Sequence, residues 1–244
     1  MKWTLADQRR PRLAREISDE LAIPPIISQI LVNRDIDSAD KMKRFFYPDL
    51  KQLSDPRDIP GIEPAVQRLV SGMARREKII IFGDYDVDGI TATALLYLVL
   101  GRFGADVEWY LPDRVDEGYG LSQGGIDDAA KKGVTLLVSV DCGITGIEEV
   151  EYAREKGIDC IITDHHEPGP EIPDALAVVD PKLGNPDAPN RELAGVGVAF
   201  KLAEALFDEL GEDKSFLYEH LDLVGLGTVA DIVPLQGENR ILAK

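Results

Sequence analysis

The sequence is poor in the features that mark secreted and membrane-bound proteins. It has two cysteines in 244 residues, Cys142 and Cys160, too few for a disulfide framework, and each lies at or just after an apolar run. No apolar run approaches the roughly 20 residues that a membrane span needs. Residues 1–10 lack the basic-then-apolar order of a secretion signal. We therefore expect a cytoplasmic chain whose cysteines pack in the core.

Basic residues are also scarce. Lysine and arginine number 27 against 44 aspartates and glutamates, a formal net charge of −17. This charge argues against binding of nucleic acid by the whole surface. It does not exclude a polyanionic substrate, because divalent ions on acidic ligands return positive charge to a cleft. The basic run Arg9, Arg10, Arg12 and Arg15 could concentrate positive charge locally, or it could be a solvated helix face.

The apolar pattern divides the chain into a helical segment, 1–75, and an α/β domain, 76–244. From residue 78 short apolar strands alternate with helices, which is typical of a parallel sheet flanked by helices on both faces. The early helices are expected at 13–21, 24–33, 38–46 and 63–75. The strands are expected at 78–82, 106–111, 135–140, 159–163 and 175–179, and the later helices at 90–103, 123–132, 145–156 and 193–210.

Acidic residues and histidines directly follow three of these strands. Asp84, Asp86 and Asp88 form the motif Asp-Tyr-Asp-Val-Asp-Gly after the first strand, Asp141 follows the third, and 164–166, Asp-His-His, follows the fourth. In parallel sheets ligands collect at the carboxyl ends of the strands, so we expect these groups to converge. Mixed carboxylate and imidazole ligands favour Mn²⁺ over Mg²⁺. Two such ions can share a carboxylate and activate water for attack on phosphorus.

Each motif alone has a simpler explanation. The first also opens a calcium-binding loop, but the twelfth position from Asp84, where that loop needs a bidentate glutamate, is Leu95. The motif also follows a predicted strand, whereas the calcium loop follows a helix. Residues 141–143 and 164–166 could be turns or helix caps. His220 has no acidic or glycine-rich turn around it, and we expect an ordinary, partly buried histidine.

Taken in order, the motifs resemble those of the DHH phosphoesterase superfamily and, within it, of its single-strand-specific exonucleases. The resemblance rests on 82–89, 140–143, 163–166, 193–201 and 226–235 and covers nearly the whole chain. It implies a Mn²⁺-dependent enzyme, with Mg²⁺ as the alternative, that degrades single-stranded DNA 5′ to 3′ into 5′-mononucleotides during repair and recombination. It also implies further domains of the DHHA1 and OB-fold types, absent from these 244 residues, so the chain is expected to be the catalytic half.

The resemblance also implies the roles of the acidic residues. Asp141 is expected to bridge two ions. Asp84 is expected to orient the ligands, with weaker ligation as the alternative. Pyrophosphatase-like relatives have a histidine at the position of Phe82, so the first ion is expected to have fewer protein ligands here. The expected metal ligands are Asp86, Asp88, Asp141, His165 and Asp231.

Substrate contacts are expected from five residues. The resemblance implies that His166 contacts the scissile phosphate. Gly195 and Gly197 precede a long predicted helix and could offer amides to a phosphate, although close helix packing explains them equally well. Lys182 and Arg191 lie in a proline-rich loop and could contact the DNA backbone or be solvated.

Two other functions stay open. One is a phosphoesterase for short oligonucleotides, phosphoadenosine phosphate or cyclic dinucleotides, against which the helical segment before residue 78 speaks. The other is a non-catalytic replication factor of the Cdc45-like branch, against which the intact set of metal ligands speaks. The expected partners are single-stranded DNA and a single-strand-binding protein, and no membrane contact is expected.

Overall fold

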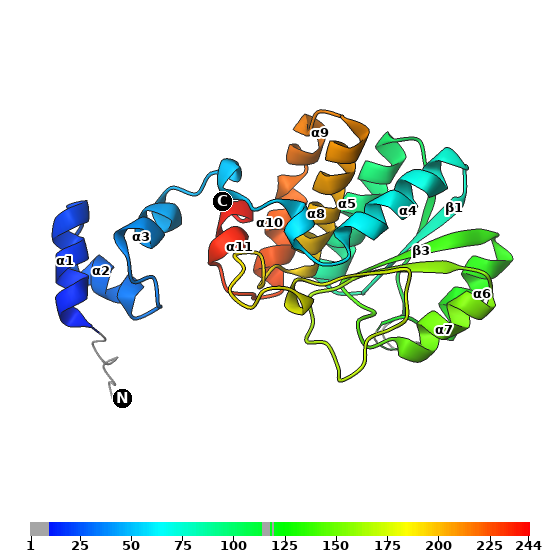
Figure 1. Cartoon of the computed structure of the whole chain (residues 1–244), viewed down its shortest axis with the longest axis horizontal. Helices are drawn as coiled ribbons and strands as arrows, with labels where there is room; N and C mark the ends of the chain where they lie inside the picture. Colours follow the sequence, from blue (N-terminus) through cyan, green and yellow to red (C-terminus); the bar gives the residue numbers. More distant parts are fainter. Residues whose placement is uncertain (1–9, 114–117, 119) are drawn as a thin grey trace. The chain divides into compact units, whose positions relative to one another are not determined.

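The computed structural model describes residues 10–113, 118 and 120–244. It contains two compact units, unit 1 (Met1–Gln52) and unit 2 (Leu53–Lys244), and each has its own apolar core (Figure 1). The boundary lies earlier than the expected residue 75. The reason is that helix α4 (Ile62–Ala74) packs against the sheet of unit 2 rather than against the preceding helices.

Unit 1 is a small cluster of helices. Prolines at first-turn positions begin α1 and α2, and Ser38 caps α3 by accepting a hydrogen bond from the Lys41 amide, as its position predicts. The elements are α1 (Pro11–Leu21), α2 (Pro25–Val32), α3 (Ala39–Phe46) and the 3₁₀ turn η1 (Leu50–Gln52). Their buried apolar residues are Ala14, Ile17, Leu31, Val32, Ile36 and Met42.

The basic run of unit 1 is a solvated surface where the structure describes it. Arg10 pairs with Asp37, and exposed Arg12 pairs with Glu16 at 3.0 Å. Arg9 lies outside the described residues. These pairs fit the solvated-face alternative.

Unit 2 is built on a five-stranded parallel sheet in the order β2-β1-β3-β4-β5, as the apolar pattern predicts. The chain runs outward in opposite directions from β1 and β3, and in such sheets ligands bind at the carboxyl ends of the strands at that point. The strands are β1 (Lys78–Gly83), β2 (Asp106–Tyr110), β3 (Val134–Val140), β4 (Asp159–Thr163) and β5 (Ala177–Val179).

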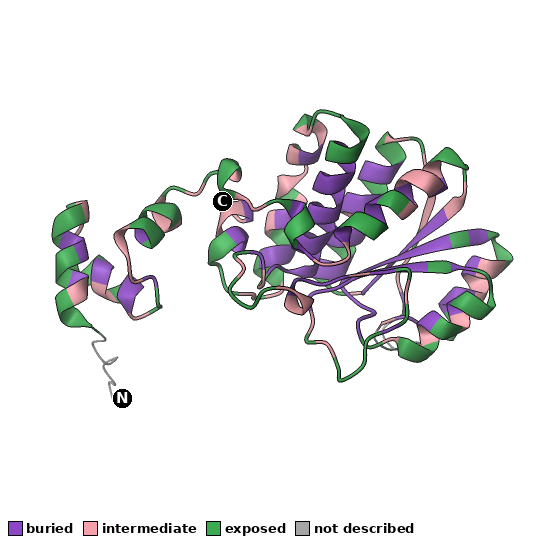
Figure 2. Cartoon of the chain, in the orientation of Figure 1, coloured by how far each residue is buried: buried purple, intermediate pink, exposed green. Residues whose placement is uncertain are grey.

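Helices cover both faces of the sheet, and β1 is buried on both sides (Figure 2). Ile79 and Ile81 pack in the core beneath α4, α5 and α8, whereas Ile80 and Phe82 pack in the core beneath α6 and α7. The buried cysteines, Cys142 and Cys160, belong to this second core, as expected. The covering helices are α5 (Val87–Arg102), α6 (Gln123–Lys131), α7 (Ile147–Glu155) and α8 (Gly195–Leu210).

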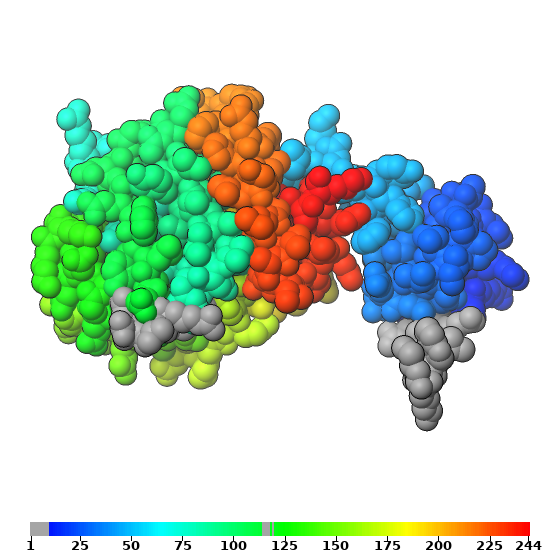
Figure 3. Space-filling model, turned by 180° about the vertical axis from the view of Figure 1, so that it is seen from behind, coloured from blue at the N-terminus to red at the C-terminus, as the bar shows by residue number. Residues whose placement is uncertain are grey.

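Three helices after α8 were not predicted. They are α9 (Ser215–Tyr218), α10 (Leu221–Ala230) and α11 (Gly237–Leu242). Helix α10 packs against α5 and α8, and Figure 3 shows its orange-red atoms beside the teal of α5. It is hard to recognise in sequence because Leu226 and Val229 make its exposed face apolar as well. The described part of the chain has no helix with the length and apolar character needed to span a membrane.

Candidate metal centre

Four neighbouring strands each end immediately before a buried aspartate. Asp84 follows β1, Asp141 follows β3, Asp164 follows β4 and Asp180 follows β5, and at most 2% of each residue is exposed. The carboxyl ends of parallel strands lie at one edge of the sheet, so the strands gather these acids as expected. Sequence reasoning missed Asp180, although its place directly after the last predicted strand was a usable signal.

The first acidic motif is the N-terminus of α5. Helix α5 begins three residues earlier than predicted, because Asp86 caps it by accepting a hydrogen bond from the Gly89 amide at 2.9 Å. Asp88 therefore lies in the first turn, where its side chain is buried. Its two carboxylate oxygens accept hydrogen bonds from the amides of Gly195 (2.6 Å) and Val196 (2.8 Å), at the start of α8. The N-terminus of α8 thus holds a carboxylate of the site.

These contacts bear on the two glycines that were expected to bind phosphate. The Gly195 amide is already bonded to Asp88, and a Cβ added to Gly195 would lie 2.6 Å from Asp141 Oδ1. A Cβ at Gly197 would lie 3.0 Å from the Leu193 side chain. The structure therefore favours the close-packing alternative for both glycines, because a larger residue at Gly195 would displace a carboxylate of the site.

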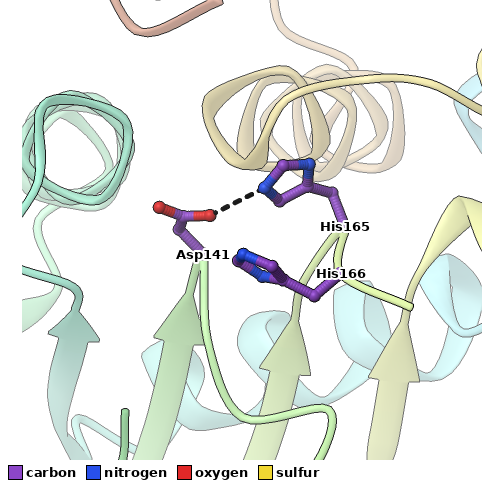
Figure 4. Close-up of side chains that lie close together, drawn as sticks. All are labelled: Asp141, His165 and His166. Atoms are coloured by element: carbon purple, nitrogen blue, oxygen red, sulfur yellow. Dashed lines mark ion pairs between the residues drawn. The ribbon is translucent and has the colours of Figure 1, made fainter. Parts of the chain in front are cut away.

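His165 faces three carboxylates. Its Nε2 lies 3.1 Å from Asp141 Oδ1, 3.9 Å from Asp88 Oδ2 and 3.8 Å from Asp231 Oδ2. Asp231 directly follows α10 as its C-terminal cap. In Figure 4, Asp141 stands at the end of its strand and points toward the His165 ring. Elements far apart in the sequence thus bring one imidazole and three carboxylates together.

Among the described residues, the candidate ligand atoms form three overlapping sets, and Asp141 belongs to two of them. In each set the atoms lie within 4.8 Å of one another: Asp84, Asp86 and Asp141 in the first, Asp88, His165 and Asp231 in the second, and Asp141, His165 and His166 in the third. Asp141 belongs to the first set and is also the carboxylate nearest to His165 of the second. This is the arrangement that a shared ligand between two ions requires.

The electrostatics of the centre fit a divalent cation. Within the described part of the chain, no lysine or arginine forms an ion pair with Asp84, Asp86, Asp88 or Asp231, and buried Asp84 Oδ1 has no hydrogen-bond partner. Burial raises the pKa of Asp84, and it raises the pKa of Asp88 to about 6. Burial, and then the charges of Asp88 and Asp86, raise the pKa of Asp141 well above its usual range. A cation would replace the missing counter-charge, and oxygen with one imidazole is a donor set that suits Mn²⁺.

The unpartnered oxygen of Asp84 also bears on the role of that residue. Asp84 was expected to orient ligands or to act as a weaker ligand. The carboxylate of Asp84 accepts backbone hydrogen bonds from Tyr85 and Asp86, as a residue that orients the loop would. Its Oδ1 has no hydrogen-bond partner among the described residues, and Asp84 groups with Asp86 and Asp141. This oxygen is therefore available to an ion, and both roles of Asp84 stay predictions.

Asp164 organises the loop that carries both histidines, a role that sequence reasoning did not assign. It accepts hydrogen bonds from the amides of Ile144 (2.9 Å), His165 (2.7 Å) and His166 (3.2 Å), and its Oδ1 lies 2.7 Å from His166 Nδ1. Burial by itself would raise the pKa of Asp164, but the hydrogen bond with His166 and the other contacts lower it. The same hydrogen bond raises the pKa of His166 to about 9. His166 is therefore a cation near neutral pH.

Phe82 and His220 lie outside the ligand sets. The Phe82 ring packs 4.8 Å from the Tyr110 ring in the core beneath α6 and α7. It therefore adds no ligand where pyrophosphatase-like relatives have a histidine. His220 is partly buried, and its Nδ1 lies 2.8 Å from the Phe216 carbonyl oxygen, in line with the expectation of an ordinary histidine.

Lys182 and Arg191 contact their own loop and its neighbour. Lys182 Nζ lies 3.2 Å from Glu167 Oε1, and Arg191 Nη1 donates a hydrogen bond to the Lys182 carbonyl at 3.1 Å. Through these contacts both side chains stabilise the loop in which they lie. Contact of either residue with DNA stays a prediction.

Comparison with known proteins agrees with this geometry. The family described as "DHH family, N-terminal domain" matches residues 78–228. The single-stranded-DNA-specific exonuclease RecJ of Bacillus subtilis (strain 168) is 41% identical over 243 residues, which are 100% of this chain and 30% of that protein.

Two solved structures of RecJ from Thermus thermophilus have the same fold. The complex with Mn²⁺ has a TM-score of 0.80 at 32% identity and covers 99% of this chain and 34% of that chain. The complex with Mg²⁺ has a TM-score of 0.68 at 29% identity, and the match covers 99% of this chain and 30% of that chain. The chain thus spans about a third of the length of these relatives, and one of the two complexes contains Mn²⁺, the metal that the donor set favours.

Proposed function

We propose that the chain is the catalytic part of a single-stranded-DNA exonuclease, because it belongs to the DHH family and the whole of its own sequence is similar to part of RecJ. In this proposal it hydrolyses DNA from the 5′ end and releases 5′-mononucleotides, as its resemblance to these exonucleases implies. Mn²⁺ is the proposed cofactor, with Mg²⁺ as the alternative. Cytoplasmic DNA repair and recombination, with a single-strand-binding protein as partner, belong to the same proposal.

One observation carries the proposal: Asp141 belongs to two of the three sets of ligand atoms, and its Oδ1 lies 3.1 Å from Nε2 of His165, which also belongs to the set with Asp88 and Asp231. Two bound ions would polarise the phosphoryl group and activate a water molecule for in-line attack on phosphorus. Asp84 and Asp86 would hold one ion, Asp88, His165 and Asp231 the other, and Asp141 both.

His166 has a different task in this proposal. Its Nδ1 is taken by Asp164 at 2.7 Å, and 44% of its side chain is exposed. That hydrogen bond raises the pKa of His166 to about 9, which favours the positively charged ring at neutral pH. A charged, partly exposed imidazole beside the ligands can hold an oxygen of the scissile phosphate and offset the charge that develops there.

The charge distribution limits how a long strand can bind. Unit 1 has ten basic and eight acidic residues, whereas unit 2 has 17 basic and 36 acidic residues. Unit 2 therefore repels DNA except where cations neutralise the centre. Affinity for long DNA should consequently depend on Mn²⁺ and fall with rising salt.

Hydrolysis of a 5′-phosphorylated single-stranded oligonucleotide in Mn²⁺ tests the proposal, with a dinucleotide in parallel. We expect mononucleotides to appear stepwise from the 5′ end. Asp141→Ala should abolish hydrolysis, because both ions lose a ligand. Asp222→Ala, at an exposed aspartate in the first turn of α10, is the matched control and should be fully active.

The results separate the proposal from the alternatives. Full activity in Asp141→Ala would refute the metal centre. Cleavage of the dinucleotide alone would favour the small-substrate phosphoesterase for this chain. Failure to bind Mn²⁺ at all would favour the non-catalytic alternative.

A further inference from the structure

Two hydroxyl side chains are completely buried in the strands that lead into the metal centre. Ser139 lies in β3, two residues before Asp141, and Thr163 is the last residue of β4, next to Asp164. A buried hydroxyl is unfavourable among apolar side chains unless it is hydrogen-bonded, so both hydroxyls are expected to have hydrogen-bond partners. Neither residue belongs to the ligand sets.

The two side chains bond to each other's strand. Ser139 Oγ donates a hydrogen bond to the Cys142 carbonyl oxygen at 2.7 Å and accepts one from the Thr163 amide at 3.3 Å. Thr163 Oγ1 in turn donates to the Ser139 carbonyl oxygen at 2.7 Å. We call Ser139 and Thr163 the hydroxyl clamp, because together they join the ends of β3 and β4.

The clamp encloses an unusual backbone conformation. Asp141 has a φ of 59°, in the left-handed region that side chains with a Cβ rarely adopt. The Cys142 carbonyl, which Ser139 Oγ holds, comes directly after this residue. The hydrogen bond thus fixes the chain on the far side of Asp141, while β3 fixes it on the near side. The carboxylate is thereby directed toward His165 (Figure 4).

The turn after Asp141 packs closely against the Ser139 hydroxyl. A Cβ added at Gly143 would lie 3.0 Å from Ser139 Oγ and 3.1 Å from Ile162 Cδ1. Replacement of Ser139 by alanine would remove the hydrogen-bond donor to the Cys142 carbonyl, and the turn would be free to relax toward an ordinary conformation.

We propose that Ser139 is a positioning residue of the metal centre. Its hydroxyl holds Asp141 in the conformation that serves both ions, and Thr163 couples this turn to the loop that begins at Asp164. The inference rests on the proposed role of Asp141 as the shared ligand. It predicts that loss of either hydroxyl weakens Mn²⁺ binding, whereas loss of a buried hydroxyl outside the metal centre lowers the stability of the fold and leaves Mn²⁺ affinity unchanged.

Direct titration of Mn²⁺ binding, followed by electron paramagnetic resonance of the free ion, tests the inference without relying on nuclease activity. Ser139→Ala should weaken Mn²⁺ binding about tenfold or more, which is typical when residues that orient metal ligands are removed. At position 163 a matched pair is available. Thr163→Val keeps the shape and loses the hydroxyl, so it should weaken binding, whereas Thr163→Ser keeps the hydroxyl and should bind as the wild type does.

A buried serine in unit 1 provides the control. Ser28 Oγ donates to the Ala14 carbonyl oxygen at 2.6 Å, a bond of the same kind outside the metal centre. Ser28→Ala should lower thermal stability in EDTA and leave Mn²⁺ affinity unchanged. Wild-type Mn²⁺ affinity in Ser139→Ala would overturn the inference. If that variant does not fold, equal affinities in the two Thr163 variants would overturn it in the same way.

The failure of this inference is distinguishable from the failure of the proposed function. Wild-type chain that binds Mn²⁺, together with an Asp141→Ala variant that does not, supports the ion centre. If Ser139→Ala then binds like the wild type, only the positioning role falls. A wild-type chain that does not bind Mn²⁺ overturns both.

Discussion

Replacement of Asp180 by asparagine should stabilise the chain at neutral pH and change its response to pH. Asp180 is fully buried; its Oδ1 accepts a hydrogen bond from the Lys182 amide at 2.8 Å, and its Oδ2 has no hydrogen-bond partner among the described residues. Burial raises its pKa from 3.8 to about 6, because the charged carboxylate loses its hydration. Asparagine has nearly the same shape, keeps an oxygen for the Lys182 amide and cannot ionise.

The sign and size of the effect follow from the raised pKa. The folded chain holds this proton more tightly than the unfolded chain does, so rising pH ionises the unfolded chain first. Stability conferred by this group therefore falls between about pH 4 and pH 6. A shift of about two pKa units corresponds to about 3 kcal/mol. About 2 kcal/mol of this is lost between about pH 4.5 and 7.5, and asparagine avoids that loss. Its unpartnered amide costs about 1 kcal/mol at every pH.

Urea unfolding in EDTA, followed by circular dichroism at about pH 4.5 and 7.5, measures the effect. The stability of Asp180→Asn relative to the wild type should rise by about 2 kcal/mol from the lower to the higher pH. The exposed-site variant Asp222→Asn should show no comparable rise. A constant difference between Asp180→Asn and the wild type at both pH values would refute the reasoning.

Four further outcomes are expected. Mn²⁺ at a hundred times its dissociation constant should raise the free energy of unfolding by about 2.7 kcal/mol for each ion bound, and EDTA should reverse this; an unchanged melting curve would contradict the ion centre. Gly195→Ala, whose Cβ would lie 2.6 Å from Asp141 Oδ1, should weaken Mn²⁺ binding about tenfold in a direct titration, and unchanged binding would show that the carboxylate can shift. Lys201→Met should cost about 3–5 kcal/mol in urea unfolding, because Lys201 Nζ lies 2.9 Å from buried Glu238 Oε2; a neutral result would contradict the stabilising role of this ion pair. Ile232→Asn should gain about 1 kcal/mol in thermal unfolding, because Ile232 is 86% exposed at a φ of 64°, and no gain would mean that the strain is small.

Much of the fold could be predicted because its strands are short apolar runs separated by helices. Each predicted strand of the sheet is present, and Ser38 caps α3 as expected. The errors arise where tertiary contacts decide. Helix α10 is apolar on both faces, so it gives no amphipathic signal, and α4 looks like its helical predecessors although it packs on the sheet.

The residues of the site could be predicted from the sequence better than the hydrogen bonds among them. The rule that ligands collect at strand ends brought Asp84, Asp141 and the Asp-His-His loop together in advance. It could not show that Asp88 bonds to the amides that begin α8, because 107 residues separate Asp88 from Gly195. Nor could a motif show the hydrogen bond from Ser139 to the Cys142 carbonyl, since that bond depends on the left-handed turn.

The hydrogen bonds of the buried acids explain why the centre depends on a cation. Asp88 accepts hydrogen bonds from two amides at the N-terminus of α8, and these offset only part of the rise in its pKa that burial causes. Asp164 accepts hydrogen bonds from three amides and contacts the His166 ring, and these contacts lower its pKa despite burial. Asp141 belongs to two of the three ligand sets, and burial together with the charges of its neighbours raises its pKa. Positive charge supplied there removes the repulsion that the rest of the fold leaves in place. Stability and metal affinity are therefore coupled most strongly through Asp141, the residue whose backbone the hydroxyl clamp constrains.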